Sequence, residues 1–139
     1  MKKILVVLSS LHIGGAEARM TDVAEKLPKY KYTVDFLCMD TSENQFFEER
    51  LKKCGVNIIK IATPSGRQLF SHYKQLKKVI KDGKYDVVHA NTSYHSGFIV
   101  AAAKKCGVPI RIVHSRTTGY GYKKLANRVA AVVGKHLVK

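Results

Sequence analysis

The sequence is short of several residue types on which whole classes of protein depend. It has no tryptophan, three prolines, three cysteines, and ten acidic residues against 25 lysines and arginines in 139 residues. Cys38, Cys54 and Cys106 are odd in number and widely spaced, which fits neither a disulfide framework nor a zinc site. We therefore expect three buried thiols in a reducing compartment.

Long apolar runs and targeting signals are also missing. No run approaches the roughly 18 residues that a membrane-spanning helix requires. The short apolar run after Met-Lys-Lys has no small-residue cleavage site behind it, and Gly14 and Gly15 interrupt it, so we do not expect it to be a signal peptide. We expect a cytoplasmic protein.

Acidic side chains are absent after Asp86, although the formal net charge of the chain is +15. A cationic C-terminal part attracts anionic partners, which include nucleic acid, phosphorylated small molecules and the anionic inner face of a membrane. Segment 120–139 has the pattern of a basic amphipathic helix. Such a helix can lie peripherally on the inner membrane face, but an ordinary surface helix packed on a sheet explains the same pattern.

Five apolar, β-branched runs alternate with segments of helical period, which predicts an α/β fold. The runs are 4–8, 32–39, 56–61, 86–89 and 110–114. Alternating strands and helices favour a three-layer, Rossmann-like domain over 1–139, with a parallel sheet covered by helices on both faces. The expected strand order is 3-2-1-4-5, with the winding reversed between strands 1 and 4. The loops after these two strands would then flank one crevice at the carboxyl edge of the sheet.

The helices are predicted from their apolar faces and their ends. Glycines are expected to end three of them, at Gly55, Gly83 and Gly107. The expected core faces are Ala16, Met20, Val23, Ala24 and Leu27 in the first helix; Phe47 and Leu51 in the second; Leu69, Tyr73, Leu76 and Ile80 in the third; and Phe98, Ala101, Ala102 and Lys105 in the fourth.

The turn at Gly14 and Gly15 joins the first strand to the first helix. A glycine pair lets the backbone come close to a ligand, and the helix start offers N–H groups and a positive dipole end to an anion. The pattern is neither G-x-G-x-x-G nor a Walker loop. A tight turn without a ligand explains the same two residues.

Two further strand ends carry hydrogen-bonding side chains. Asn91, Thr92 and Ser93 follow the fourth strand and can contact a ligand, cap the next helix, or do both. His89, inside that strand, is expected to be a core histidine bonded to a backbone carbonyl. After the fifth strand, His114 can donate to a sugar hydroxyl or phosphate, and Arg116 can bind phosphate with two parallel hydrogen bonds.

Neither a serine hydrolase nor a metal site is expected. The chain has no G-x-S-x-G elbow, and its histidines lack ligand spacing on one element.

Three segments together resemble the N-terminal domain of group 1 (family 4) glycosyltransferases. They are the first strand with the following Gly14-Gly15-Ala16-Glu17, segment 85–91 and segment 108–115. These enzymes have two Rossmann domains, the GT-B type, and the likeness is closest to those of bacterial capsular and exopolysaccharide synthesis. The resemblance implies a retaining hexosyltransferase that moves a sugar from a nucleotide-sugar to a glycan or lipid-linked acceptor. Cofactors and metals are not expected.

The resemblance also implies roles for particular residues. Gly14 and Gly15 would approach the donor diphosphate, His114 would contact the donor sugar near its anomeric centre, and Asn91 with its neighbours would line the acceptor side. The E-x7-E motif of the family belongs to its second, nucleotide-sugar-binding domain, and we expect the chain to end before that domain. We therefore expect an N-terminal, acceptor-side fragment that folds but does not catalyse transfer by itself.

Two other classes of function remain open on the residues alone. A non-catalytic nucleotide- or phosphate-binding module would use the same glycine turn. A nucleic-acid binder would explain the charge, but no recognition motif is visible, and the aromatic residues fall mostly at core spacing.

Overall fold

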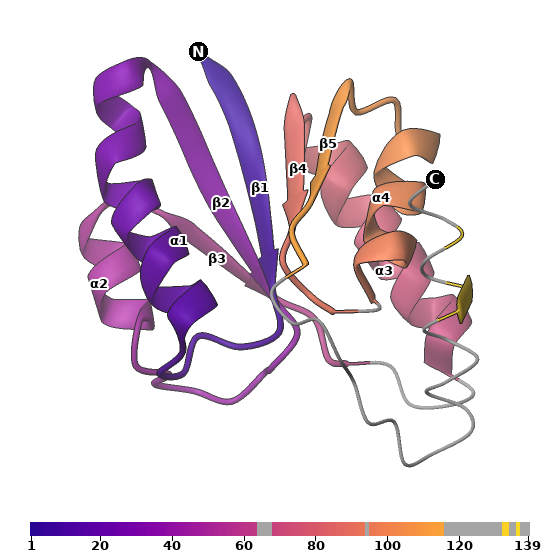
Figure 1. The fold of residues 1–139 in the computed structure, drawn as a ribbon, viewed down its shortest axis with the longest axis horizontal. Coiled ribbons are helices and arrows are strands. Elements are labelled where there is room, and N and C mark those ends of the chain that lie inside the picture. Colours follow the sequence, from indigo (N-terminus) through magenta and orange to yellow (C-terminus); the bar gives the residue numbers. More distant parts are fainter. Residues whose placement is uncertain (64–67, 94, 116–131, 134–135, 137–139) are drawn as a thin grey trace.

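A five-stranded parallel sheet organises the chain (Figure 1). The computed structural model describes residues 1–63, 68–93, 95–115, 132–133 and 136. Its strand order is β3-β2-β1-β4-β5, which confirms the predicted order. The elements are β1 (Lys2–Leu8), α1 (Gly15–Lys26), the 3-10 helix η1 (Leu27–Tyr30), β2 (Tyr32–Cys38), α2 (Glu48–Lys53), β3 (Asn57–Lys60), α3 (Leu69–Gly83), β4 (Val87–Ala90), α4 (His95–Lys105) and β5 (Ile110–Val113).

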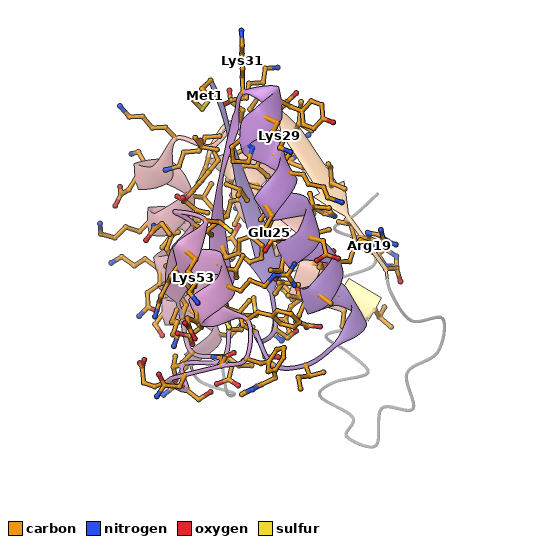
Figure 2. The ribbon with its side chains drawn as sticks, turned by 90° about the vertical axis from the view of Figure 1, so that its left-hand side faces the viewer. Met1, Arg19, Glu25, Lys29, Lys31 and Lys53 are labelled. Atoms are coloured by element: carbon orange, nitrogen blue, oxygen red, sulfur yellow. The ribbon has the colours of Figure 1, made fainter. Side chains whose placement is uncertain are left out.

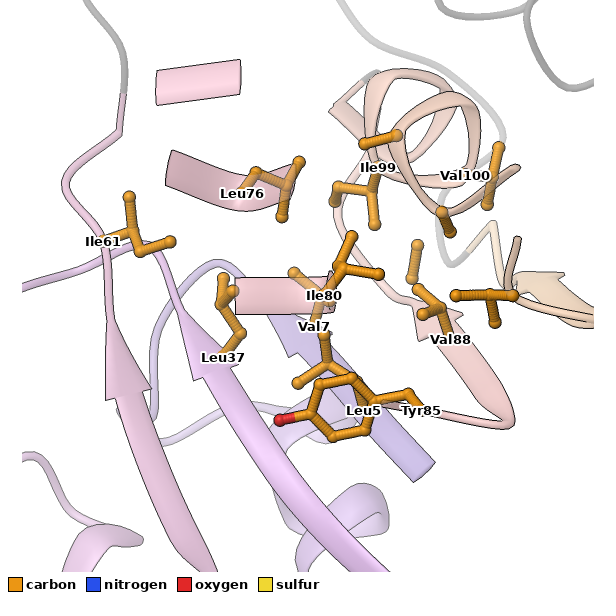
Figure 3. Close-up of a cluster of buried hydrophobic side chains, with 14 of the residues drawn as sticks. Leu5, Val7, Leu37, Ile61, Leu76, Ile80, Tyr85, Val88, Ile99 and Val100 are labelled. Atoms are coloured by element: carbon orange, nitrogen blue, oxygen red, sulfur yellow. The ribbon is translucent and has the colours of Figure 1, made fainter. Parts of the chain in front are cut away.

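Helices cover the sheet from both sides, as expected for a parallel sheet (Figure 1). α1 and α2 pack on one face, where they meet side chains such as Val6 and Phe36. α3 and α4 pack on the other, where Ile80 and Ile99 join Val7 in a second core cluster (Figure 3). Alternate residues of each strand therefore enter different cores.

The predicted core faces of the helices are only partly right. Met20, Ala24, Leu51, Leu76 and Ile80 are buried as predicted.

In α1, Val23 is exposed and Thr21 is buried in its place, because the Thr21 hydroxyl donates to the Glu17 carbonyl (2.8 Å). In α3, His72 is buried, whereas Leu69 remains 44% exposed. α4 turns Ile99 and its neighbours to the sheet, while Phe98 and Ala101 are only half-buried.

α3 ends at Gly83, as predicted, but Gly83 is not the left-handed residue that follows the helix. Gly55 and Gly107 have the expected positive φ angles of 74° and 77°, but after α3 the left-handed residue is Lys84, with φ 49°. Gly83 instead makes room, because a Cβ on it would collide with the ring of Tyr85. That ring is buried in the α3–α4 core, and its hydroxyl donates to Asp35 Oδ2 (2.7 Å).

α1 and α2 are tied together by ion pairs on their outer surface. Arg50 donates to Glu25 Oε1 (2.6 Å) and Asp22 Oδ1 (2.8 Å). Figure 2 looks onto this side of the molecule, with Glu25 on α1 and Lys53 on α2. This face of the domain carries paired charges rather than an open apolar surface.

One further expectation fails among the described residues. Cys38 is buried and Cys106 half-buried, but Cys54 is exposed, so the prediction of three buried thiols is wrong. Segment 120–139 lies outside the described residues except at three positions. Two of these, Val132 and Val133, are 57% and 44% exposed. Within the described ranges, no helix has the length and apolar character needed to cross a membrane.

Candidate functional site: the carboxyl edge of the sheet

The predicted site residues lie at the carboxyl ends of three adjacent strands. β1 is paired with β4, and β4 with β5. The Asn91 N–H donates to Val7 O and the His114 N–H to Ala90 O, both at 2.9 Å, so the ladder continues to the point where the polar residues begin. The structure thus brings Gly14, Asn91 and His114 to one edge of the sheet, where the direction of winding reverses.

The backbone at Gly14 and Gly15 does not require glycine. Gly14 is extended, with φ −167° and ψ 159°, and Gly15 is the first helical residue of α1. Neither has the positive φ that would favour glycine, so a strained tight turn does not explain the pair. A Cβ on Gly15 would meet nothing within 4 Å. The space before the helix is therefore open, and the absence of a side chain keeps the backbone accessible there.

The start of α1 has N–H groups available to an anion. The first helical hydrogen bond runs from the Ala18 N–H to Gly14 O (3.0 Å), so the N–H groups of Gly15, Ala16 and Glu17 precede the ladder. Gly14, the N-cap residue, has no side chain with which to cap the helix. The Glu17 carboxylate lies beside Gly14, since a Cβ there would collide with it. Glu17 is the acidic residue of the first turn, so its carboxylate interacts with the positive end of the helix and lies next to the candidate phosphate position.

The loop before Gly14 is held by a residue that the sequence analysis missed. Gln45 is 3% exposed, and its Oε1 accepts from the Leu11 N–H at 2.5 Å. Its Nε2 donates to the carbonyls of Asp40 and Ser42, both at 3.0 Å. The β1–α1 loop and the β2–α2 loop are therefore fastened together through one amide. No sequence pattern marks Gln45, because its role depends on which loops lie side by side.

His12 and Asp40 form a second unpredicted pair at this edge. His12 Nε2 lies 3.2 Å from Asp40 Oδ2, and His12 is exposed. The backbone N–H of Ser42 donates to Asp40 Oδ1 (2.8 Å), and this bond is the main cause that lowers the pKa of Asp40. Both residues follow the ends of neighbouring strands. The strand-end reasoning used for Asn91 and His114 would have found them.

The loop after β4 combines capping with exposure. The Ser96 hydroxyl donates to Thr92 O (2.7 Å) and accepts from the Thr92 N–H (3.1 Å), so these two buried residues close the start of α4. Asn91 is 8% exposed, and its side-chain amide donates to His89 O (3.3 Å). Ser93 is exposed at the edge. The capping role predicted for this loop is present at Thr92 and Ser96, and Ser93 remains accessible to a ligand.

His114 is exposed and held by an aromatic neighbour. Its ring stacks on His89, with ring centroids 5.9 Å apart and planes 9° from parallel. His89 lies on β4 and is half-buried, so it supports the plane of the His114 ring. Arg116, the remaining predicted site residue, lies outside the described residues. Across the part of the chain that is described, no cluster of three metal-binding side chains occurs.

The fold is that of a Rossmann-like domain, and its candidate site residues lie at the switch point of the sheet. The sequence profile of the glycosyl transferase 4-like domain matches residues 14–138. The chain therefore belongs to the glycosyl transferase 4-like family, which confirms the resemblance.

Two curated relatives are named as glycosyltransferases. EpsF of Bacillus subtilis (strain 168) is 29% identical over 142 residues, which cover 99% of this chain and 36% of EpsF. CapH of Staphylococcus aureus, named for capsular polysaccharide biosynthesis, is 27% identical over 119 residues, which cover 85% of this chain and 32% of CapH. The chain spans about a third of the length of these relatives.

A solved structure supports the fold. Anabaena HepE, crystallised in complex with UDP, matches with a TM-score of 0.68 at 17% identity, over 99% of this chain and 35% of HepE.

Proposed function

We propose that the chain is the N-terminal, acceptor-side domain of a retaining glycosyltransferase. The enzyme would move a sugar from a nucleotide-sugar to a glycan or lipid-linked acceptor in cell-surface polysaccharide synthesis, at the cytoplasmic face of the membrane. The family and the names of EpsF and CapH support this class of reaction. The UDP bound by HepE supports a nucleotide-sugar donor.

The glycine pair is the observation that carries the proposal. Gly15 does not need glycine for its backbone angles, and the space beside it is open, so its lack of a side chain leaves room for an approaching ligand. The N–H groups at the start of α1 would donate to the donor diphosphate. Negative charge builds on this group as the sugar departs, so fixed N–H groups stabilise the transition state without a metal ion.

The other edge residues receive roles by position. His114, held flat by His89, would donate to a hydroxyl of the donor sugar near its anomeric centre. Asn91, Thr92 and Ser93 would line the acceptor side, where exposed Ser93 is best placed for direct contact. We also assign Arg116 a contact with a sugar or a phosphate.

We further propose that a second domain completes the donor site. EpsF and CapH are about three times as long as the region they share with this chain, which leaves room for such a domain. The 139-residue chain would then bind the diphosphate weakly and catalyse no transfer by itself.

Binding of uridine, UMP and UDP to the 15N-labelled chain tests the phosphate site. We expect affinity to rise with each phosphate, and the largest amide shifts at Gly15, Ala16 and Glu17. Gly15→Val should abolish these shifts while far-UV circular dichroism stays unchanged, because the new side chain enters open space. UDP shifts that map elsewhere, or that survive Gly15→Val, would refute the phosphate site.

The proposed role of His114 in sugar transfer must be tested in the longer protein that contains this domain. There, His114→Ala should lower kcat for sugar transfer, with UDP affinity nearly kept. Binding of UDP without transfer to any acceptor would favour a non-catalytic nucleotide-binding module.

A further inference from the structure

The two helical faces of the domain differ in charge. On α1 and α2, five acidic residues stand among five lysines and arginines, and Arg50, Lys52 and Lys53 are engaged in ion pairs. On α3 and α4, six lysines accompany one acidic residue, Asp82, which pairs with Lys78. Among the described residues, the other five lysines form no ion pair. They are Lys74, Lys77, Lys81, Lys104 and Lys105.

An open apolar cavity of about 550 Å³ lies along this same cationic face. Its walls come from the N-terminal half of α3 and from α4, and include Leu69, Phe70, Tyr73, Phe98 and Ala101. Phe70 is 80% exposed and Leu69 44% exposed, although both border the cavity. An apolar cavity edged by large exposed apolar side chains is a binding feature rather than ordinary surface.

The lysines flank the cavity on both helices. Lys74 follows Phe70 by one helical turn, so the two share a face of α3. Lys105 itself borders the cavity, and Lys104 lies three residues after Ala101 on α4. Lys74, Lys104 and Lys105 are all exposed. The cationic groups therefore stand beside an apolar opening that has an aromatic side chain at its edge.

The polar groups within the cavity are compatible with hydrocarbon. His72 and His95 are the only histidines that border it. Burial lowers the pKa of both, and His72 lowers that of His95 further, so both rings are neutral at pH 7. The nearest acidic residue of the two helices, Asp82, lies at the far end of α3. A ligand with an apolar part and an anionic part matches this arrangement.

We propose that the α3–α4 face docks on a bilayer of anionic phospholipid. Phe70 and Leu69 enter the acyl region, hydrocarbon occupies the cavity, and Lys74, Lys104 and Lys105 pair with lipid phosphates. Nucleic acid matches the lysines but not the apolar cavity. This surface differs from the basic C-terminal segment, and its role does not depend on sugar transfer.

The lack of tryptophan allows a direct test of insertion. Phe70→Trp would be the sole tryptophan of the 139-residue chain. Its emission should shift to the blue with vesicles of 30% phosphatidylglycerol in phosphatidylcholine, and lipids brominated in the acyl chain should quench it. Phe46→Trp is the matched control, because Phe46 is 62% exposed and lies next to α2 on the opposite side. It should show neither effect.

Charge is tested by vesicle sedimentation of a triple variant, Lys74→Gln, Lys104→Gln and Lys105→Gln. Each lysine near an anionic membrane raises the membrane partition coefficient about fivefold, so the triple variant should bind the vesicles about 100-fold more weakly. The control changes Lys26, at the end of α1, and Lys29 and Lys31, which follow it, to glutamine. This removes the same charge from the α1 side, where Figure 2 shows Lys29 and Lys31. It should retain most of the binding, and inorganic phosphate alone should not displace the chain.

Several outcomes would overturn the proposal. It fails if the chain does not bind the anionic vesicles at all, or if both triple variants lose vesicle binding equally. It also fails if the emission spectrum of Phe70→Trp does not change when the chain is bound to vesicles, or if inorganic phosphate displaces the chain from them. Loss of binding only when Lys123, Lys124 and Arg128 are changed would assign the membrane contact to the C-terminal segment instead. Tighter binding to RNA than to vesicles, dependent on Lys74 and Lys105, would make this face a nucleic-acid surface.

Discussion

Replacing Gln45 by methionine should weaken both the fold and the phosphate loop. Methionine fills a similar volume but offers neither the acceptor for the Leu11 N–H nor the two donors for the carbonyls of Asp40 and Ser42. A buried N–H without an acceptor costs about 1–3 kcal/mol, and each lost donor bond about 0.5–1.5 kcal/mol. Since the loop can relax and water can reach the two carbonyls, we expect a loss of about 2–4 kcal/mol in the free energy of unfolding.

Urea unfolding followed by circular dichroism measures this loss, with the slope of the transition checked for a change in the unfolded state. Gln75→Met is the matched control, because Gln75 is exposed on α3, and its change should stay within about 0.5 kcal/mol. In the folded variant, amide exchange at Leu11 should also accelerate. A Gln45→Met protein as stable as the control would refute the idea that this amide fastens the two loops.

Three other changes probe separate parts of the structure. Gly83→Ala should cost about 1–3 kcal/mol in urea unfolding, because the added Cβ collides with the Tyr85 ring. Burial lowers the pKa of His72, so the unfolded chain binds more protons, and stability should fall as pH drops below about 6.5; His72→Asn should flatten that slope. Glu17→Gln should lower stability by about 0.3–1 kcal/mol through the helix dipole, yet tighten UDP binding in calorimetry because a like charge is removed from the phosphate position. Weaker UDP binding by Glu17→Gln would place the diphosphate elsewhere.

The sheet could be predicted because its signals are local and mutually consistent. Apolar runs such as Leu5 to Leu8 need burial on two faces, and the helices between them force parallel connections. The buried faces of the helices were harder to predict from the sequence. Thr21 and His72 can be buried because each has a backbone carbonyl as its hydrogen-bond partner, Glu17 O for Thr21 and Ala62 O for His72. Periodicity counts such residues as polar and assigns the core to Val23 or Leu69 instead.

The site was predictable to the extent that it follows strand ends. Gly14, Asn91 and His114 were found in this way, and the structure brings them to one edge. Gln45 was missed because its importance comes from the contact between two loops, which no spacing encodes. The stacking of His89 on His114 likewise depends on the register of β4 and β5.

The two proposed sites occupy different parts of one domain, and their positions fit a single task. The phosphate position lies at the carboxyl edge of the sheet, before α1, whereas the cavity lies between α3 and α4. Both α3 and α4 begin at that same carboxyl edge, because each follows a parallel strand. The exposed Phe70 and Leu69 stand in the first turn of α3, and His95 stands at the start of α4. A bilayer docked there would therefore lie near the edge that holds His114 and Ser93, so a lipid-linked acceptor could reach that edge without leaving the membrane.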